Sequence, residues 1–290
     1  MAGEMDGGLV STAWLADELG AQDLRLYDVT VHLRPTDKGP YRIESGRQDY
    51  LDAHIPGAAF IDLQETLSDR SSRFSFTLPA LDQLKAGFEA AGIGPGVRVV
   101  LYAANSPMWA TRVWWMLRSA GFGPVAVLDG GLSKWRAEGR PVEGGERRYA
   151  PAAGLDLTPA PGAWASKDDV LKSIGEASVC TINALAPSMH SGADGPRYGR
   201  KGRIKGSLNV PFASLLQEDG SFRDPEALRA LFDEVGAMKA ARVICYCGGG
   251  ISATMDAMAL TRAGHPNVSV YDGSMAEWCA DPDLPMESDV

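Results

Sequence analysis

The sequence lacks the features that mark membrane proteins, secreted proteins and nucleic-acid-binding proteins. None of its apolar runs approaches the roughly 20 residues that a transmembrane helix needs. Its start, MAGEMDGGLV, has neither the basic segment nor the apolar segment of a secretory signal. Positive charge is scarce, because 28 Lys and Arg stand against 37 Asp and Glu. We therefore expect a cytoplasmic protein that binds neither nucleic acid nor a membrane.

Cysteine and histidine are also few, with four of each. The cysteines are Cys180, Cys245, Cys247 and Cys279, and their spacing gives no pair of CxxC knuckles and no CxxC…HxxxH pattern. A structural metal site is therefore not expected. Scattered thiols in an acidic chain fit a reducing compartment, where a free thiolate survives to do chemistry.

An internal repeat is the most informative feature that is present. VAVLDGGLSKW at 125–135 resembles VSVYDGSMAEW at 268–278. This match places Asp129 against Asp272 and Trp135 against Trp278, with 143 residues between the members of each pair. A chain of 290 residues has room for about two domains. The repeat predicts that these two domains share one fold.

Two further matches extend the repeat upstream. VRVVLYA at 97–103 matches ARVICYC at 241–247, and HIPGAAFIDL at 54–63 matches RIKGSLNVPF at 203–212. Between the copies, residues 149–162 are rich in Pro, Ala and Gly, which is typical of a linker. We therefore predict domains at 1–148 and 163–290, joined by a linker at 149–162.

Each copy alternates short β-branched runs with helical patterns. Residues 24–30, 98–103 and 125–129 read as buried strands, and SVCTIN, RVICYC and VSVYD repeat them in the second copy. Residues 80–92 and 110–121 read as helices that end at a glycine. The alternation indicates an α/β fold in which each domain is a parallel sheet flanked by helices.

The loop after the strand RVICY carries the best candidate for chemistry. Cys247 leaves the carboxyl end of this strand, where α/β domains bind ligands, and a helix ending at Gly264 follows. The positive end of that helix favours a thiolate. Three glycines would let the loop curl through left-handed torsions and turn its amides toward the sulfur. The residues of this cradle are Gly248, Gly249, Gly250, Ile251, Ser252 and Ala253.

This loop has three other interpretations. A phosphatase needs an Arg six positions after the nucleophile to clamp phosphate, and that position is Ala253. A Cys-His protease lacks support because no His lies in an evident partnering motif. A buried structural cysteine beside a glycine-rich turn remains the plain alternative.

The motifs together resemble one known family. The strand ending in YC, the loop CGGGIS and the segment AGHPNVSVYDGSMAEW look like the catalytic half of the tandem rhodanese and mercaptopyruvate sulfurtransferase family. HIPGAAFID and RVWWMLRSAGF resemble its N-terminal half. The resemblance implies two tandem rhodanese-like domains and ping-pong sulfur transfer through a persulfide on Cys247. The first domain has Ala103 at the cysteine position, so we expect it to be catalytically inactive.

The resemblance also implies the reactants. It suggests a small anionic sulfur donor, thiosulfate or 3-mercaptopyruvate, and an acceptor that is cyanide, a small thiol or a protein thiol. No cofactor or metal is required. The alternative is a persulfide carrier or sulfur-sensing module with little turnover, and the sequence leaves the physiological donor and acceptor open.

Some positions depart from the family pattern. The loop has three glycines where members that use mercaptopyruvate have Gly-Ser-Gly or Gly-Thr-Gly. In those members the hydroxyl is proposed to work with a His and an Asp of the N-terminal domain. Asp62 falls on that Asp, whereas Phe76 stands where the His is expected. Leu185 replaces the first Arg that would hold the mercaptopyruvate carboxylate.

A basic segment offers a different way to bind an anion. PRYGRKGRIKG at 196–206 places five cations in a loop of an otherwise acidic chain. Our hypothesis is that Arg197 and Arg200 reach the cleft and hold a small dianion such as thiosulfate. The alternative is a solvated charged loop without a role in binding. Together with Asp62, these two arginines are the candidate substrate-binding residues.

Overall fold

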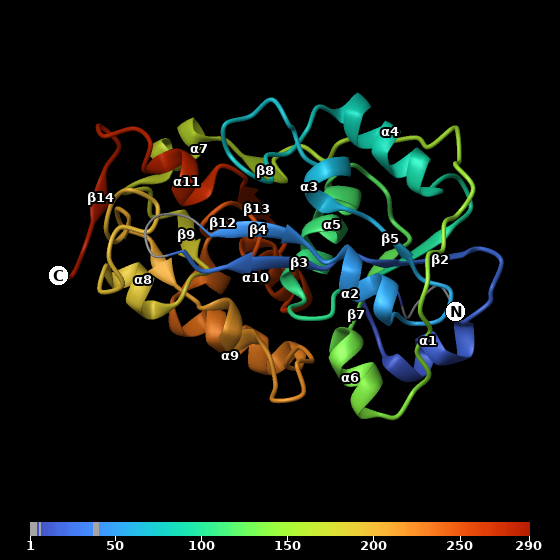
Figure 1. The fold of residues 1–290 in the computed structure, drawn as a ribbon. Coiled ribbons are helices and arrows are strands. Elements are labelled where there is room, and N and C mark those ends of the chain that lie inside the picture. Colours follow the sequence, from blue (N-terminus) through green and yellow to red (C-terminus); the bar gives the residue numbers. More distant parts are fainter. Residues whose placement is uncertain (1–4, 6, 37–40) are drawn as a thin grey trace.

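The computed structural model describes residue 5 and residues 7–36 and 41–290, so the expectation about the first ten residues falls partly outside the described part. Two parallel sheets of five strands form its two halves (Figure 1). In the first half the strand order is β1-β7-β6-β2-β5. The bounds are β1 Leu9–Val10, β2 Leu24–Asp28, β5 Ala59–Phe60, β6 Arg98–Tyr102 and β7 Val125–Leu128.

The second half repeats this topology with the order β11-β9-β12-β13-β8. Its strands are β8 Trp164–Ala165, β9 Val179–Asn183, β11 Leu208–Asn209, β12 Arg242–Tyr246 and β13 Val268–Tyr271. All neighbours in both sheets pair in parallel. The structure therefore confirms the expected α/β fold with two parallel sheets. The proposed domain limits, 1–148 and 163–290 with a linker at 149–162, leave each sheet whole.

Helices cover the faces of both sheets. In the first half they are α1 Thr12–Glu18, α2 Arg47–Asp52, α3 Leu63–Thr66, α4 Leu81–Ala91, α5 Met108–Ser119 and α6 Gly131–Ala137. In the second half they are α7 Lys167–Ser173, α8 Pro187–Ser191, α9 Pro225–Glu234, α10 Ala253–Arg262 and α11 Ser274–Trp278, with 3-10 turns at Phe212–Leu215 and Ala237–Lys239. Gly92, Gly121 and Gly264 have positive φ values next to the ends of α4, α5 and α10, as the sequence predicted. Among the described residues no helix is long and apolar enough to cross a membrane.

The two halves share one core, because α5 and α10 pack against each other. Almost every residue of α5 is buried, which explains why its sequence is apolar on all sides. The hydroxyls of Thr111 and Thr254 lie 2.8 Å apart across this helix pair. These two threonines are 143 residues apart, like the aspartates of the repeat, so the contact relates equivalent positions of the two copies.

Two small antiparallel pairs were not expected. One is β10 Arg203–Ile204 with β14 Met286–Glu287. The other is the pair β3 Val31–Arg34 and β4 Arg42–Ser45, which belongs to the first half in sequence. Figure 1 shows β3 and β4 running from the first half toward β9 and β12 of the second. Side chains of this hairpin consequently face residues of the second half across a cavity.

Candidate active site at Cys247

Cys247 lies directly after β12, the central strand of the second sheet, and α10 begins six residues later. Its side chain is only 2% exposed. It lines a cavity of about 480 Å³ whose walls come from both halves of the chain. The carboxyl end of the sheet is the position that the sequence predicted for this cysteine.

The start of α11 holds the loop in place through hydrogen bonds. The Ser274 hydroxyl accepts hydrogen bonds from the N–H groups of Cys247 and Gly250, both at 3.1 Å, and donates to the Tyr271 carbonyl at 2.8 Å. The N–H of Met275 donates to the Cys247 carbonyl at 3.0 Å. Ser274 is fully buried and has φ +47°, an unusual value for a residue with a side chain. Sequence reasoning missed Ser274, although the repeat places it opposite Gly131, which shares the positive φ.

Five amides of the loop have no hydrogen-bond partner within the described part of the chain. They are the N–H groups of Gly248, Gly249, Ile251, Ser252 and Ala253. Such a series of free donors at a strand end and helix start is suited to an anion. Gly250 belongs to the predicted cradle, but Ser274 already occupies its N–H.

The structure gives a different reason for glycine at each of the three positions of the loop. Gly250 alone has a positive φ, of +73°, and a Cβ there would lie 2.5 Å from the Asp272 carbonyl oxygen. A Cβ on Gly248 would overlap the hydroxyl of Tyr198. At Gly249 the nearest atom to an added Cβ would be the Ser75 carbonyl oxygen at 4.0 Å, so this position has space. The expectation of left-handed torsions is therefore met by Gly250 but not by its two neighbours.

A buried arginine from the first half reaches this loop. Arg112 of α5 is fully buried, and its guanidinium forms an ion pair with Asp272 at 2.6 Å. It also donates to the carbonyls of Gly250 at 3.1 Å and Phe76 at 2.6 Å. Asp272 in turn accepts the Leu78 N–H at 2.8 Å. The first half thus holds the cysteine loop of the second half in place.

Sequence reasoning missed Arg112 as well. The signal was a single charged residue at the start of the apolar run RVWWML. In the sequence its partner, Asp272, stands out only as a member of the repeat. Because the two residues lie on different halves, nothing in the local pattern linked them.

The predicted substrate-binding residues lie in different surroundings. Arg197 stacks over the ring of Tyr41 at 4.5 Å, and Tyr41 lines the Cys247 cavity. The guanidinium of Arg200 instead donates to the backbone carbonyls of Asp281 and Leu284, at 3.0 and 2.8 Å. Arg200 is not among the residues that line the cavity.

Asp62 is engaged at a helix start. Its carboxylate accepts the Glu65 N–H at 3.1 Å as the cap of α3, and the Ser45 hydroxyl at 2.6 Å. It does not line the cavity. Arg197 does not line the cavity either, but it contacts the cavity wall through Tyr41. Arg200 and Asp62 make their hydrogen bonds elsewhere in the fold.

Most of the cavity wall is apolar. Phe76 and Leu185, two of the positions that depart from the family pattern, both line it. Arg73 is the one charged side chain among the described residues of the lining, and it is exposed at the surface. Polar groups come from Ser75, Ser252, Tyr41 and Tyr198. Burial next to Cys247 raises the pKa of Tyr198, so its hydroxyl stays protonated at neutral pH.

The other three cysteines are poor candidates for chemistry. Burial raises the pKa of Cys180 to about 11 and that of Cys245 well above its ordinary value. It also raises the pKa of Cys279. Their thiols therefore stay protonated near neutral pH, where a thiol is a weak nucleophile.

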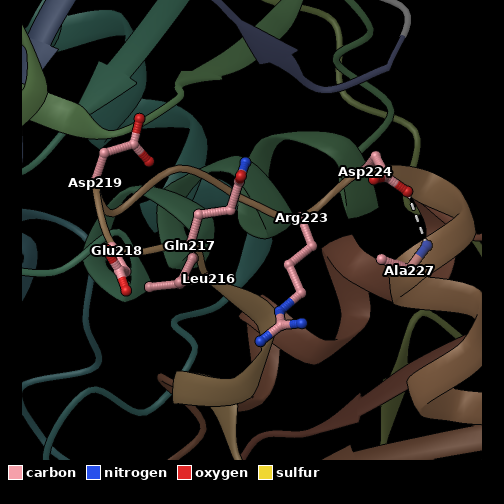
Figure 2. Close-up of a pocket in the computed structure, with 7 residues that line it drawn as sticks. All are labelled: Leu216, Gln217, Glu218, Asp219, Arg223, Asp224 and Ala227. Carbon is pink, nitrogen blue, oxygen red and sulfur yellow. Dashed lines mark hydrogen bonds between the residues drawn. The ribbon is translucent and has the colours of Figure 1, made fainter.

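A second hollow, of about 570 Å³, lies beside the start of α9 and contains no cysteine (Figure 2). Two of its acidic groups already have partners in the fold: Asp224 caps α9 by accepting the Ala227 N–H at 2.8 Å, and Asp219 pairs with Lys134 at 2.6 Å. It shares no lining residue with the Cys247 cavity. The cavity at Cys247 is therefore the better candidate for an active site.

Comparison with known proteins agrees with this geometry. The model of the rhodanese-like domain matches residues 11–138 and 194–281. The chain is 33% identical over 281 residues to 3-mercaptopyruvate sulfurtransferase of Homo sapiens, covering 93% of this chain and 91% of that protein. It is 33% identical over 283 residues to thiosulfate sulfurtransferase of Bos taurus, with the same coverage of 93% and 91%. The crystal structure of SseA from Escherichia coli, a 3-mercaptopyruvate sulfotransferase, superposes with a TM-score of 0.80 at 29% identity over 92% of this chain and 98% of that one.

The chain therefore belongs to the rhodanese family, as a protein with two rhodanese-like domains in tandem. It is an enzyme, a sulfurtransferase, as the sequence motifs indicated.

Proposed function

We propose that this enzyme moves a sulfane sulfur from a small anionic donor to a thiophilic acceptor through a persulfide on Cys247. The donors that the relatives suggest are thiosulfate and 3-mercaptopyruvate. The acceptor is cyanide or a thiol. The observation that carries the proposal is a cysteine that lines a cavity and heads a loop in which five amide N–H groups have no partner among the described residues.

The reaction with thiosulfate has two balanced steps. The Cys247 thiolate attacks the outer sulfur of thiosulfate, the S–S bond of the donor breaks, and sulfite leaves with the electron pair. The acceptor then attacks the outer sulfur of the persulfide, and Cys247 leaves as a thiolate. Both forms of the cysteine are anionic at sulfur. The free amides of the loop supply donors for that charge without any metal or cofactor.

Anion binding in this proposal depends on cations near the cavity mouth. Arg197 is the candidate from the basic segment, because it stacks on Tyr41 of the cavity wall. Arg73 lines the cavity directly. We assign Arg200 and Asp62 to the fold because their polar atoms are engaged elsewhere. Charge reversal at Arg197 should raise the KM for thiosulfate, and an unchanged KM would remove Arg197 from the site.

The competing function is a sulfur carrier that is loaded once and turns over little. Steady-state formation of thiocyanate from thiosulfate and cyanide separates the two. The proposal expects sustained turnover by the wild-type protein and none by Cys247→Ser. One stoichiometric release of sulfur without turnover would support the carrier instead. The proposal also expects a reducing compartment, the cytoplasm, since all four cysteines are free thiols.

A further inference from the structure

The cavity over Cys247 is built mainly of hydrocarbon. Leu33 and Ile43 of the β3–β4 hairpin, Phe76 and Met108 of the first half, and Leu185 and Phe212 of the second half line it. Phe76 is almost completely buried and is held against Trp109, with 5.4 Å between ring centres. The walls are therefore ordered apolar surfaces. They come from segments far apart in the sequence, so the cavity exists only when the two halves are packed together.

The size and chemistry of this cavity do not match the small anions of the proposed reaction. A volume of about 480 Å³ lies in the range of sites that bind small organic molecules. Thiosulfate and cyanide have no apolar surface to place against these walls. A carboxylate among them would lose water without gaining a buried cation, since the one charged lining residue, Arg73, is exposed. The small donors need only the end of the cavity at the cysteine loop.

We propose that the sulfur acceptor of this enzyme is a small organic thiol with an apolar body, which fills the cavity while its sulfur meets the Cys247 persulfide. This inference rests on the proposed function, because it requires a persulfide at Cys247. The acceptor thiol loses its proton to solvent, and its thiolate attacks the outer sulfur. The bond between that sulfur and Cys247 breaks, the product leaves as an organic persulfide, and Cys247 keeps the electron pair as a thiolate. The reverse reaction loads Cys247 from the same class of persulfide.

The position of the sulfur favours a small thiol over a cysteine of a folded protein. Cys247 is 2% exposed, and Tyr198 packs against the neighbouring Gly248. The hairpin β3–β4 and the segment with Phe76 line the same cavity as the sulfur and form part of its walls. A protein thiol would have to pass these walls, whereas a small molecule can enter from the mouth near Arg73.

A single-turnover experiment tests the inference. The enzyme is loaded with sulfur from thiosulfate, freed of donor, and mixed with straight-chain thiols from ethanethiol to hexanethiol. The loss of persulfide is followed by quenched mass spectrometry of the intact protein. We expect the second-order rate constant to rise about threefold for each added methylene until the cavity is full. Cysteine persulfide in solution, treated with the same thiols, is the control and should show no such increase.

Two comparisons sharpen the result. 3-Mercaptopropionate should react at least tenfold more slowly than butanethiol, because its carboxylate would be desolvated. Leu185→Arg should flatten the dependence on chain length, whereas the matched control Leu185→Met should keep it. Rates for each variant are divided by its own rate with cyanide. If Leu185→Arg fails to fold, the wild-type series decides alone.

The outcomes distinguish the inference from the proposed function. Rates that are independent of chain length, or faster with the carboxylate, overturn the inference while the persulfide mechanism stands. Rapid discharge by a reduced protein thiol, with slow discharge by every alkanethiol, also overturns it. A protein that never takes up sulfur at Cys247 contradicts the proposed function itself, and the inference falls with it.

Discussion

The site at Cys247 and its counterpart at Ala103 are built on the same frame. Each follows a tyrosine that ends the central strand, and each carbonyl accepts an N–H from the next short helix, Leu132 to Ala103 at 3.3 Å and Met275 to Cys247 at 3.0 Å. The repeated aspartates serve both halves alike. Asp129 accepts the Phe222 N–H and Asp272 accepts the Leu78 N–H, each at 2.8 Å and each from the opposite half.

The two loops differ in what their polar groups do. In the first half the Ala104 N–H donates to the Thr30 hydroxyl at 2.8 Å, and the Asn105 side chain donates to the Val31 carbonyl at 2.8 Å. The first loop is thus tied to its own half. In the second half Leu185 follows its strand where Thr30 follows β2, and it lines the cavity without binding the loop. The N–H of Gly248, the counterpart of Ala104, has no partner among the described residues. We therefore expect reactivity to depend on this free amide as well as on the cysteine.

The largest expected effect concerns the ion pair that only the Cys247 side has. Arg112→Met removes a fully buried cation and leaves Asp272 without its partner. Met is chosen because the second copy has Met255 at the position equivalent to Arg112, directly after Thr254, the equivalent of Thr111. We expect a loss of about 3–5 kcal/mol in the free energy of unfolding, measured by urea denaturation, and a severe loss of turnover. A loss below about 1 kcal/mol would show that the pair does not hold the loop.

Next in size is the effect of a methyl group at the glycine that touches Asp272. Gly250→Ala places a side chain at φ +73° and 2.5 Å from the Asp272 carbonyl oxygen. We expect a loss of about 2–3 kcal/mol in stability together with most of the activity. Gly249→Ala is the matched control, because its Cβ has space and its φ is ordinary. Equal losses in the two variants would contradict this account of the loop.

A smaller effect is expected at the end of the strand that pairs with the central strand, at Asp28 of β2 in the first half and Asn183 of β9 in the second. Burial raises the pKa of Asp28 to about 6, despite its hydrogen bonds to Thr30. The folded protein therefore binds this proton more tightly than the unfolded chain. Stability is undiminished below the ordinary value of about 3.8 and falls as the pH rises through about 6.

Asp28→Asn should remove this pH-dependent loss. Asn183 shows that an amide fits, since its side chain accepts the Leu185 N–H at 2.8 Å and donates to the Tyr246 hydroxyl at 3.0 Å. We expect the variant to be more stable than the wild type by on the order of 2 kcal/mol at pH 7 and equal to it near pH 3.5. Urea denaturation across this pH range checks the difference. A constant difference at all pH values would rule out the titration of Asp28 as its cause.

For the last variant we expect no gain of activity. Ala103→Cys in a Cys247→Ser background adds a thiol at the equivalent strand end without the glycine loop. We expect no thiocyanate formation above background, because the Ala104 N–H next to the new thiol is already bonded to the Thr30 hydroxyl. Measurable turnover by this variant would mean that the cysteine alone suffices.

Local patterns made much of the molecule predictable. The strands around Tyr102 and Tyr246 and the helices that end near Gly92, Gly121 and Gly264 follow from periodicity and end signals within short windows. The sequence pattern of strand, glycine loop and helix then placed Cys247 at the carboxyl end of the sheet. Features that need both halves were missed, namely the Arg112–Asp272 pair and the hairpin that lines the cavity. These contacts join residues far apart in the chain, and no local window records them.

In the basic segment at 196–206, by contrast, a local pattern suggested more than the fold provides. Its charges looked like a binding site in the sequence, yet Arg203 pairs with Glu287 and Asp289, and Arg200 holds backbone carbonyls. The acidic partners lie more than 80 positions away in the chain. The charge pattern therefore predicted an exposed segment. Only the fold determines which of its side chains are free to bind an anion.

Mass spectrometry of the protein after treatment with thiosulfate tests the central claim most directly. The protein is freed of donor, its free thiols are blocked, and its peptides are analysed without reductant. The account requires the mass of one additional sulfur atom on the peptide that contains Cys245 and Cys247, with fragmentation of that peptide placing it on Cys247, and none on Cys180 or Cys279. Sulfur on another cysteine, or none on Cys247, would contradict it.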